Sequence, residues 1–506
     1  MARKTVLLAA LSLLTHYLHL ATAQVLSPAT VHRTNWNSSF TLTPAQIAAA
    51  QLDNGLAATI QTIVQTHQTQ QAFGGPHEDD FYTVPPLTNM TGSLKPGQIL
   101  KVQAVTDATA YTIPPGTALS RIIYTTTNFN GTLIPASAFI LWPYTARQFG
   151  SSANRRRTTG DKSPKASVVI WAHGTSGFFA SNSPSSHRSL WYDNMGPYTL
   201  AEAGYAVVAP DYAGLGVRKS WDGSDIPHQY HVSPASAGDC LYAFRAALAA
   251  FPTTLGKDFV VMGHSQGGGV AWAVPELLVS QREKFADLVP GYKGTVAASP
   301  TTDMFGNPNI VPFMLTTVGQ AVSSIFPSFT LGEWLAPLGI ARTNLGREVE
   351  ADIVGFSQLM FNALATDIYR ADYNSSWYAT AYGKLGDAGH HDFKGPLLVL
   401  QGTEDTYILY NITTATVAEN ARRFPHRDLE FHVVPGISHS PVLHASRLYW
   451  LQWIEDRFEG KPLAKKGNFR TEAKSLLPIA QYQKFGFSLP LWVGLPEFQY
   501  QQGLGI

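Results

Sequence analysis

One serine stands in a pattern that favours nucleophilic chemistry. Ser265 lies at the centre of Gly263–Gly267, which reads Gly-His-Ser-Gln-Gly. The apolar run Phe259–Met262 before it predicts a buried strand, and the residues from about Gly268 predict a helix. This context is typical of a nucleophile elbow, a tight turn that lifts the serine hydroxyl clear of the sheet edge. In a chain with 42 glycines the pattern alone is weak, so the flanking strand and helix support the interpretation.

A serine alcohol becomes a useful nucleophile when a base takes its proton, and the base needs a carboxylate that fixes its tautomer. After a nucleophile elbow the expected chain order is serine, acid, histidine. Asp405 follows the apolar run Pro396–Leu400 and a glycine turn, so it is the predicted acid, while Glu404 remains the competitor. His439 lies in a short loop after the run Leu429–Val434 and is the predicted general base.

An oxyanion hole needs two N–H donors aimed at the charge that develops on the carbonyl oxygen. One predicted donor is the N–H of Gln266, at the start of the helix. The other is the N–H of Thr175, in the loop His173–Gly177 after the apolar run Ser167–Ala172, and the Thr175 hydroxyl is a further candidate. The alternative is that this glycine-containing loop serves only as a turn.

Two other clusters carry residue types that bind metals. One is the segment His77–Asp80, and the other is His390–Asp392. The second precedes the acid-bearing strand and therefore breaks the expected order of the triad. The first is interpreted as a solvated loop and the second as a loop, and no metal site is predicted.

The run of strands and helices predicts the fold. Ser120–Thr127 and Thr132–Trp142 surround a hairpin signal, Asn130-Gly131, and predict the antiparallel start of a sheet. Wholly apolar strands then alternate with helical segments, a pattern that predicts βαβ units and a mostly parallel sheet covered by helices on both faces. The expected helices are Ser189–Ala203, Ala235–Ala250 and a closing helix Leu443–Phe458; the other expected strands are Gly204–Ala209, Gly294–Ala298 and, as the last one, Leu429–Val434.

The chain divides into six expected segments. A break in the pattern between Ser299 and Gly389, rich in aromatic residues, predicts a helical cap over the edge of the sheet where α/β proteins bind ligands. The apolar tail is too short and broken to span a bilayer, and we expect it to form one wall of an acyl-binding tunnel with the cap. The segments are a signal peptide 1–23, an N-terminal extension 24–120, the first core part 121–300, the cap 301–390, the second core part 391–460 and the tail 461–506.

The N-terminus and the sequons indicate a secreted glycoprotein. Arg3 and Lys4 precede an apolar stretch that ends in Ala21-Thr22-Ala23, so cleavage is expected after Ala23. With a single cysteine, Cys240, no intrachain disulfide can form, and the thiol is interpreted as a buried structural one. The net charge of +1 and a charged fraction of 14% give no sign of nucleic-acid binding. The candidate glycosylation sites are Asn37, Asn89, Asn130, Asn374 and Asn411.

Five pieces of sequence in order resemble the α/β-hydrolase superfamily, and within it they are similar to fungal secretory lipases and their carboxylesterase relatives. The resemblance covers roughly residues 165–460. It implies an α/β-hydrolase fold and ester hydrolysis through an acyl-enzyme, without a metal or an organic cofactor. The pieces are His173–Thr175, Ala209–Gly216, Gly263–Gly268, Gly402–Asp405 and Gly436–His439.

The leading hypothesis is therefore a secreted serine carboxylesterase or lipase-like enzyme with the triad Ser265, Asp405 and His439. Its partner would be a small-molecule or lipid ester, and a lipid interface is a second candidate. A second hypothesis keeps the triad but makes the protein an acyltransferase, an amidase or an esterase of secondary metabolites. A third is a non-catalytic binding module, which the presence of all three triad candidates disfavours. The ester, its chain length and the oligomeric state stay open.

Overall fold

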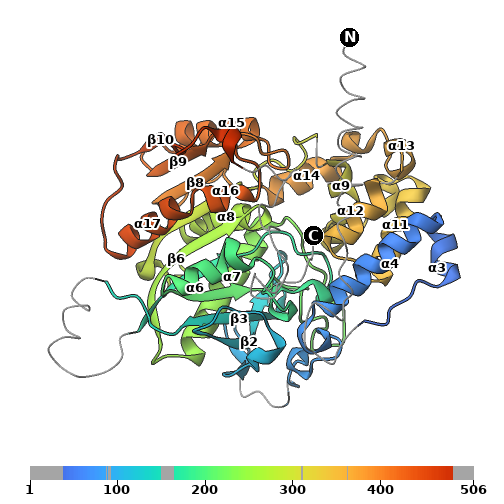
Figure 1. Ribbon diagram of the computed structural model, residues 1–506, viewed down its shortest axis with the longest axis horizontal. Helices are drawn as coiled ribbons and strands as arrows, with labels where there is room; N and C mark the ends of the chain where they lie inside the picture. Colours follow the sequence, from blue (N-terminus) through green and yellow to red (C-terminus); the bar gives the residue numbers. More distant parts are fainter. Residues whose placement is uncertain are drawn as a thin grey trace, which may run out of the picture.

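The computed structural model describes residues 38–86, 88, 93–149, 165–308, 311–361 and 363–482, with only the backbone at 311–313, 361 and 374. Within these residues ten strands form one sheet in the order β1-β2-β3-β5-β4-β6-β7-β8-β9-β10 (Figure 1). The strands are β1 Ile99–Gln103, β2 Thr117–Thr127, β3 Leu133–Pro143, β4 Ala166–Ala172, β5 Ala206–Pro210, β6 Leu255–His264, β7 Tyr292–Ala298, β8 Leu397–Gly402, β9 Leu429–Val434 and β10 Asn468–Glu472.

The direction of the strands changes along the sheet as the sequence predicts. The pairs β1–β2, β2–β3 and β3–β5 are antiparallel, and every later pair from β5 to β10 is parallel. The hairpin between β2 and β3 turns at Gly131, whose φ of +84° favours glycine. Because parallel strands end at the same edge, the loops after β4, β6, β8 and β9 meet there.

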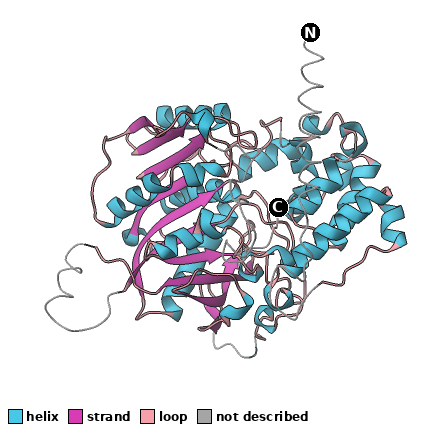
Figure 2. Cartoon of the chain, viewed as in Figure 1, coloured by secondary structure: helices cyan, strands magenta, loops and turns pink. Residues whose placement is uncertain are grey.

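Helices cover both faces of the sheet (Figure 2). In β4, Val168 and Ile170 pack into a core with α7 and α8, while Val169 and Trp171 pack into a second core on the opposite face with α6 and α17. All four side chains are fully buried, which explains why these strands are apolar without alternation. The helices are α6 Pro197–Glu202, α7 Ser233–Ala250, α8 Gln266–Ser280, α15 Tyr410–Arg423, α16 Pro441–Ala445 and α17 Arg447–Phe458.

The segment between β7 and β8 is helical, as the sequence predicts, and supplies most of an apolar cluster separate from the two cores beside the sheet. Two helices of the N-terminal extension, α3 and α4, join this cluster, and Figure 1 shows them beside α11 and α12. Residues 24–120 therefore supply part of the packing of the cap as well as strand β1. The helices are α3 Pro44–Ala49, α4 Asn54–Thr69, α9 Val311–Thr317, α10 Gly319–Ile325, α11 Pro337–Glu348, α12 Ile353–Phe361, α13 Ala365–Ile368 and α14 Trp377–Gly386.

The predicted helix Ser189–Ala203 is wrong as one continuous helix, and its first four residues are not helical at all. Only α6 and a single 3₁₀ turn, Asp193–Met195, are helical there. Leu190 and Trp191 have φ angles of 52° and 67°, which a right-handed helix cannot contain. The apolar spacing reflects the burial of this segment and not a helical period.

Leu429–Val434 is a strand, but the prediction that it is the last one is also wrong. Strand β10, from the predicted tail 461–506, pairs in parallel with β9 and forms the edge of the sheet. Apart from Phe469 its side chains are polar, and all five are partly or fully exposed, so it lacks the apolar run of the inner strands. The predicted closing helix is divided into α16 and α17 at Ser446.

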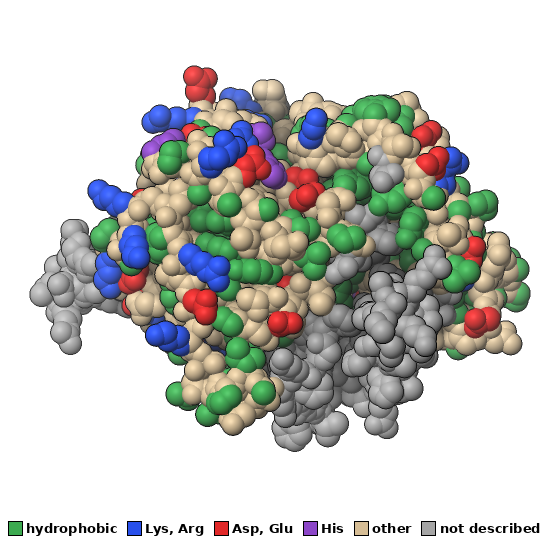
Figure 3. All heavy atoms as spheres, turned by 90° about the horizontal axis from the view of Figure 1, so that it is seen from above, with side chains coloured by type: hydrophobic (Ala, Val, Ile, Leu, Met, Phe, Trp, Pro, Cys, Tyr) green, Lys and Arg blue, Asp and Glu red, His purple; other side chains and the backbone are tan. Residues whose placement is uncertain are grey.

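Several predicted surface features lie outside the described residues, namely the signal peptide, Asn37, Asn89 and the apolar tail from residue 483. Asn130 and Asn411 are exposed, and the side chain of Asn374 is not described. Cys240 is a buried free thiol, as expected. In the described part of the chain, none of the helices combines the length and apolarity that a bilayer crossing requires. On the face shown in Figure 3, side chains of both charge signs are interspersed.

Candidate active site

The turn at Ser265 has the geometry predicted for a nucleophile elbow. Strand β6 ends at His264 and α8 begins at Gln266, two residues earlier than expected. Ser265 between them has φ 60° and ψ −122°, a conformation that costs on the order of 1–3 kcal/mol for a non-glycine residue. A Cβ on Gly267 would lie 2.0 Å from the carbonyl oxygen of Ala172, so the turn requires glycine there.

Of the two candidate acids, Asp405 is the one whose carboxylate contacts His439 in the structure. Its Oδ1 accepts the N–H groups of Tyr407 and Ile408 at 3.0 and 2.8 Å, and its Oδ2 lies 2.8 Å from Nδ1 of His439. Asp405 is buried, whereas Glu404 is exposed. Burial raises the pKa of Asp405, but the positive charge and hydrogen bond of His439 and the Ile408 N–H outweigh it, so the pKa lies below its usual range.

His439 is placed by the loop after β9. This loop approaches the end of β8 so closely that a Cβ on Gly402 would lie 2.2 Å from the carbonyl oxygen of Ile437. Because a carboxylate only accepts, Nδ1 of His439 donates to Asp405, and in the neutral ring Nε2 is left as the unprotonated nitrogen. That is the state a general base requires.

The structure connects Ser265 to His439 through a third residue and not by a direct contact. Among the described residues, no hydrogen bond joins the Ser265 hydroxyl to His439. Their connection runs through His264, whose Nε2 lies 3.1 Å from the carbonyl oxygen of His439. The rings of His264 and His439 have centroids 4.5 Å apart. The serine–base hydrogen bond of a hydrolase is often loose without substrate and tightens in the complex.

The two predicted oxyanion donors follow neighbouring strands: Thr175 lies in the loop His173–Gly177 after β4, here called the oxyanion loop, and Gln266 begins α8 after β6. Ala172 at the end of β4 is paired with Gly263 at the end of β6, so the Thr175 loop and the Ser265 turn are adjacent. As the first residue of α8, Gln266 has no intrahelical acceptor for its N–H. The hydroxyl of Thr175 is 2.9 Å from that of Tyr230, a contact that orients the threonine side chain.

His228 holds the side chain of Gln266, a contact that sequence reasoning missed. Nδ1 of His228 lies 3.1 Å from the carbonyl oxygen of Ala213, and its Nε2 lies 3.3 Å from Nε2 of Gln266. Burial lowers the pKa of His228 to about 3, so the ring is neutral. It donates to the carbonyl and accepts from the Gln266 amide. The only sequence signal was a histidine in a loop, which is not specific.

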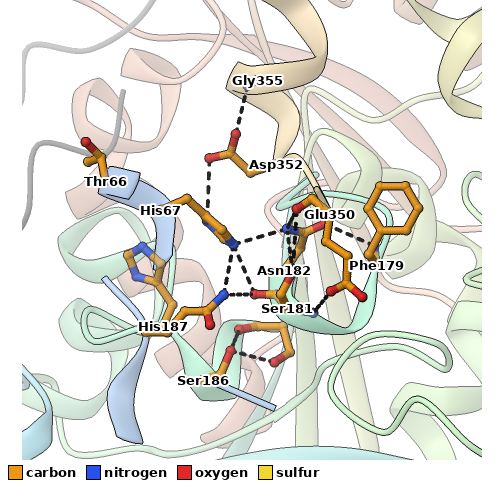
Figure 4. Close-up of polar contacts among 12 residues, drawn as sticks. Thr66, His67, Phe179, Ser181, Asn182, Ser186, His187, Glu350, Asp352 and Gly355 are labelled. Carbon is orange, nitrogen blue, oxygen red and sulfur yellow. Dashed lines mark hydrogen bonds and ion pairs between the residues drawn. The ribbon is translucent and has the colours of Figure 1, made fainter. Parts of the chain in front are cut away.

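A buried polar network joins His67 and the segment around Ser181 to Glu350 and Asp352 of the cap (Figure 4). His67 on α4 has Nε2 3.2 Å from the carbonyl oxygen of Ser181 and Nδ1 3.6 Å from Oδ2 of Asp352 in the cap. The Oδ1 atom of Asn182 accepts the N–H groups of Phe178 and Phe179. The network thus reaches the residue directly after the loop His173–Gly177. No local pattern in the sequence signals it, because its members come from three distant segments.

Side chains in both clusters with metal-binding residue types form ion pairs with arginines of the protein. Asp79 pairs with the buried guanidinium of Arg121 at 2.6 Å, so it is not part of a fully solvated loop as interpreted. His390 and Asp392 lie in a loop, as predicted, and Asp392 pairs with Arg427. Within the described residues no group of three histidine, cysteine or acidic side chains is arranged to hold a metal ion.

Comparison with known proteins places this geometry in a family. The model of the alpha/beta hydrolase family matches residues 169–449. The structure is similar to that of lipase A from Candida antarctica in its closed state, with a TM-score of 0.58 and 16% identity over 78% of this chain and 89% of that one. It is also similar to the rice cell wall degrading esterase LipA from Xanthomonas oryzae, with a TM-score of 0.51 and 17% identity over 72% and 97% of the two chains.

At such identities the likeness concerns the fold. A search among curated proteins found no match. The matched residues run from within β4 to the closing helix and include the Ser265 turn, Asp405 and His439. The chain belongs to the alpha/beta hydrolase family.

Proposed function

We propose that this protein is a secreted serine hydrolase of carboxylic esters, a carboxylesterase or lipase-like enzyme. Ser265 is the nucleophile, His439 the general base and Asp405 the acid that orients it. The N–H groups of Gln266 and Thr175 form the oxyanion hole. The proposed mechanism needs neither a metal nor an organic cofactor.

The reaction proceeds in two halves. Nε2 of His439 takes the hydroxyl proton as Oγ of Ser265 attacks the carbonyl carbon, and the negative charge on the carbonyl oxygen is held by the two N–H donors. The bond to the alcohol then breaks, and His439 returns the proton to the leaving oxygen. Water, deprotonated by the same nitrogen, attacks the acyl carbon and releases the acid, while Oγ recovers its proton.

The observation that carries this proposal is the buried pair of Asp405 and His439 at the edge of the sheet where the Ser265 turn stands. A carboxylate that accepts from Nδ1 leaves Nε2 as the base, and the strained turn presents the serine from the end of β6, at the same edge of the sheet. The names of the similar structures, a lipase and a cell wall degrading esterase, favour ester hydrolysis over the other reactions of a serine triad.

A series of nitrophenyl esters from acetate to palmitate tests the proposal. We expect hydrolysis by the wild type and a loss on the order of 10⁶ in kcat for Ser265→Ala, as for a triad nucleophile elsewhere. Activity of Ser265→Ala within about tenfold of the wild type would contradict the assignment. Adding a competing alcohol or amine separates hydrolysis from acyl transfer, and an amide substrate tests for an amidase.

The apolar cluster of the cap favours an acyl chain as the part of the substrate that it covers. Each additional buried CH₂ contributes about 0.8 kcal/mol, so kcat/KM should rise roughly fourfold per added CH₂ until the site is filled. A preference for acetate would instead favour a small-acyl esterase. Contact with a lipid interface belongs to the same proposal, and an excess of activity on emulsified over dissolved ester would support it.

Secretion is part of the proposal and has its own test. Expression in a eukaryotic host should give a mature N-terminus near Gln24, after the expected cleavage at Ala23. Asn130 and Asn411, which are exposed in the structure, should carry glycans. Removal of the glycans by an endoglycosidase should shift the mass, whereas an unshifted mass would contradict this part.

A further inference from the structure

A strained segment lies next to the site but has no part in the proposed chemistry. Leu190, Trp191 and Asp193 have φ angles of 52°, 67° and 36°, in the left-handed region that non-glycine residues rarely adopt. Strain of this kind persists only where the surroundings hold it, and it clusters at functional sites. The residue it positions is Tyr192, which lies within the segment and is buried.

The hydroxyl of Tyr192 touches both sides of the site. It lies 2.7 Å from Nδ1 of His264, the residue before Ser265. It also lies directly beneath the oxyanion loop, because a Cβ on Gly174 would come within 2.0 Å of the Tyr192 hydroxyl. The ring of Tyr192 packs against Trp171 at the end of β4, with centroids 5.3 Å apart.

The contacts of His264 define its tautomer. Burial, and then the positive charge of His439, lower the pKa of His264 to about 3, so the ring is neutral. Its Nε2 faces the carbonyl oxygen of His439, which can only accept, so Nε2 carries the proton. Nδ1 is then an acceptor, and the hydroxyl of Tyr192 donates to it.

We propose that Tyr192 and His264 are positioning residues that set the place of His439 relative to Ser265. The Tyr192 hydroxyl fixes the tautomer of His264, whose Nε2–H then holds the backbone carbonyl of His439. Asp405 fixes the ring of His439 from the other side, so the base is held at two points. The inference rests on the proposed function, because it concerns the transfer of the serine proton, which is sensitive to small displacements.

The first test removes one hydroxyl. Tyr192→Phe should lower kcat about tenfold with KM unchanged, the effect of losing one hydrogen bond that matters only in the transition state. Tyr242→Phe is the matched control: Tyr242 is also buried, on α7, and its hydroxyl has no hydrogen-bond partner among the described residues. That variant should keep the wild-type kcat.

The second test separates positioning from packing. His264→Met keeps the size of the side chain but removes its N–H donor. This change should lower kcat by at least about tenfold. His264→Gln places an amide N–H near the position of Nε2 and should recover most of that loss. In the His264→Met background, Tyr192→Phe should have little further effect, because the two residues act through one chain of hydrogen bonds.

The outcomes distinguish the inference from the function on which it rests. A wild type that is inert toward esters and toward a fluorophosphonate overturns both. An active wild type in which Tyr192→Phe keeps kcat, or in which His264→Met equals His264→Gln, overturns the inference alone. Nitrogen-15 NMR of histidine-labelled protein adds a readout without substrate: His264 should show the Nε2–H tautomer, and the Nδ1–H tautomer would contradict the proposal.

Discussion

Gly177, at the end of the oxyanion loop, pairs with Asp352 of the cap in an antiparallel bridge. The N–H of Ile353 is directed at the carbonyl oxygen of Ser176 at 3.4 Å, so the contact continues along both backbones. The loop that carries Thr175 is therefore held from outside by the cap. With Thr175 as one of the proposed oxyanion donors, displacement of the cap would be expected to change the proposed oxyanion hole as well.

Asp352→Ala should destabilise the cap. The Oδ1 atom of Asp352 accepts the N–H of Gly355 in the first turn of α12 at 2.8 Å, and loss of such a helix N-cap hydrogen bond costs about 1 kcal/mol. Asp352→Asn keeps this acceptor and is the matched control. We expect a lower melting temperature and a lower kcat/KM for Asp352→Ala than for Asp352→Asn. Equal values for the two variants would mean that the hydrogen bond to the side-chain oxygen at position 352 does not stabilise the cap.

Asp405→Asn should be far more damaging than Glu404→Gln. The asparagine can present its amide to Nδ1 of His439 and then favours the wrong tautomer, a change that costs about 10⁴ in kcat in another serine triad. Glu404 is exposed, so Glu404→Gln should stay within about twofold of the wild type. Steady-state kinetics on one ester measure both variants, and the reverse order would move the acid by one position.

Gly267→Ala should disrupt the turn at Ser265. The added methyl would lie 2.0 Å from the backbone oxygen of Ala172, which cannot move without shifting β4. Gly238→Ala on α7 is the matched control, because its nearest contact would be an ordinary 3.7 Å to Tyr242 and alanine favours a helix. We expect a loss of soluble or active protein for Gly267→Ala only. An active, stable Gly267→Ala would show that the turn has more room than the structure gives it.

Glu276 should make the stability of the protein depend on pH. Burial raises its pKa to about 8, although the N–H groups of His391 and Gly389 act in the opposite direction. The folded protein therefore retains a proton that the unfolded chain releases above its ordinary pKa of 4.5. Stability is lost as the pH rises from about 4.5 through about 8 and then levels off.

Glu276→Gln has no proton to lose, so its advantage over the wild type in melting temperature should grow across that interval. Glu283→Gln, at an exposed position, is the control and should show no such trend. A constant difference between Glu276→Gln and the wild type from pH 5 to about 9 would mean that Glu276 titrates normally.

The sequence predicted the parts of the site that depend on local rules. The Ser265 turn needs two glycines between a strand and a helix, and Asp405 and His439 follow apolar strands that end at one edge. The sheet, its antiparallel start and the helical cap were predicted for the same reason. Each has a period or a turn signal within a short window.

The parts that were missed depend on contacts between distant segments. Strand β10 is a polar edge strand that forms only because β9 offers it hydrogen bonds. The strained segment around Tyr192 resembles a helix in its apolar spacing. The pairing of His67 with Asp352 and that of His264 with Tyr192 exist only in the folded chain, and a buried histidine without a motif has no local signature.

Covalent labelling by a fluorophosphonate, which reacts with an activated serine, tests the catalytic assignment of Ser265 most directly. Mass spectrometry of the digested wild type should find the adduct on Ser265 alone, and the adduct should be absent in Ser265→Ala and strongly reduced in His439→Ala. Esterase activity together with an adduct on another serine, or a labelled Ser265→Ala, would contradict the claim that Ser265, His439 and Asp405 form the catalytic site.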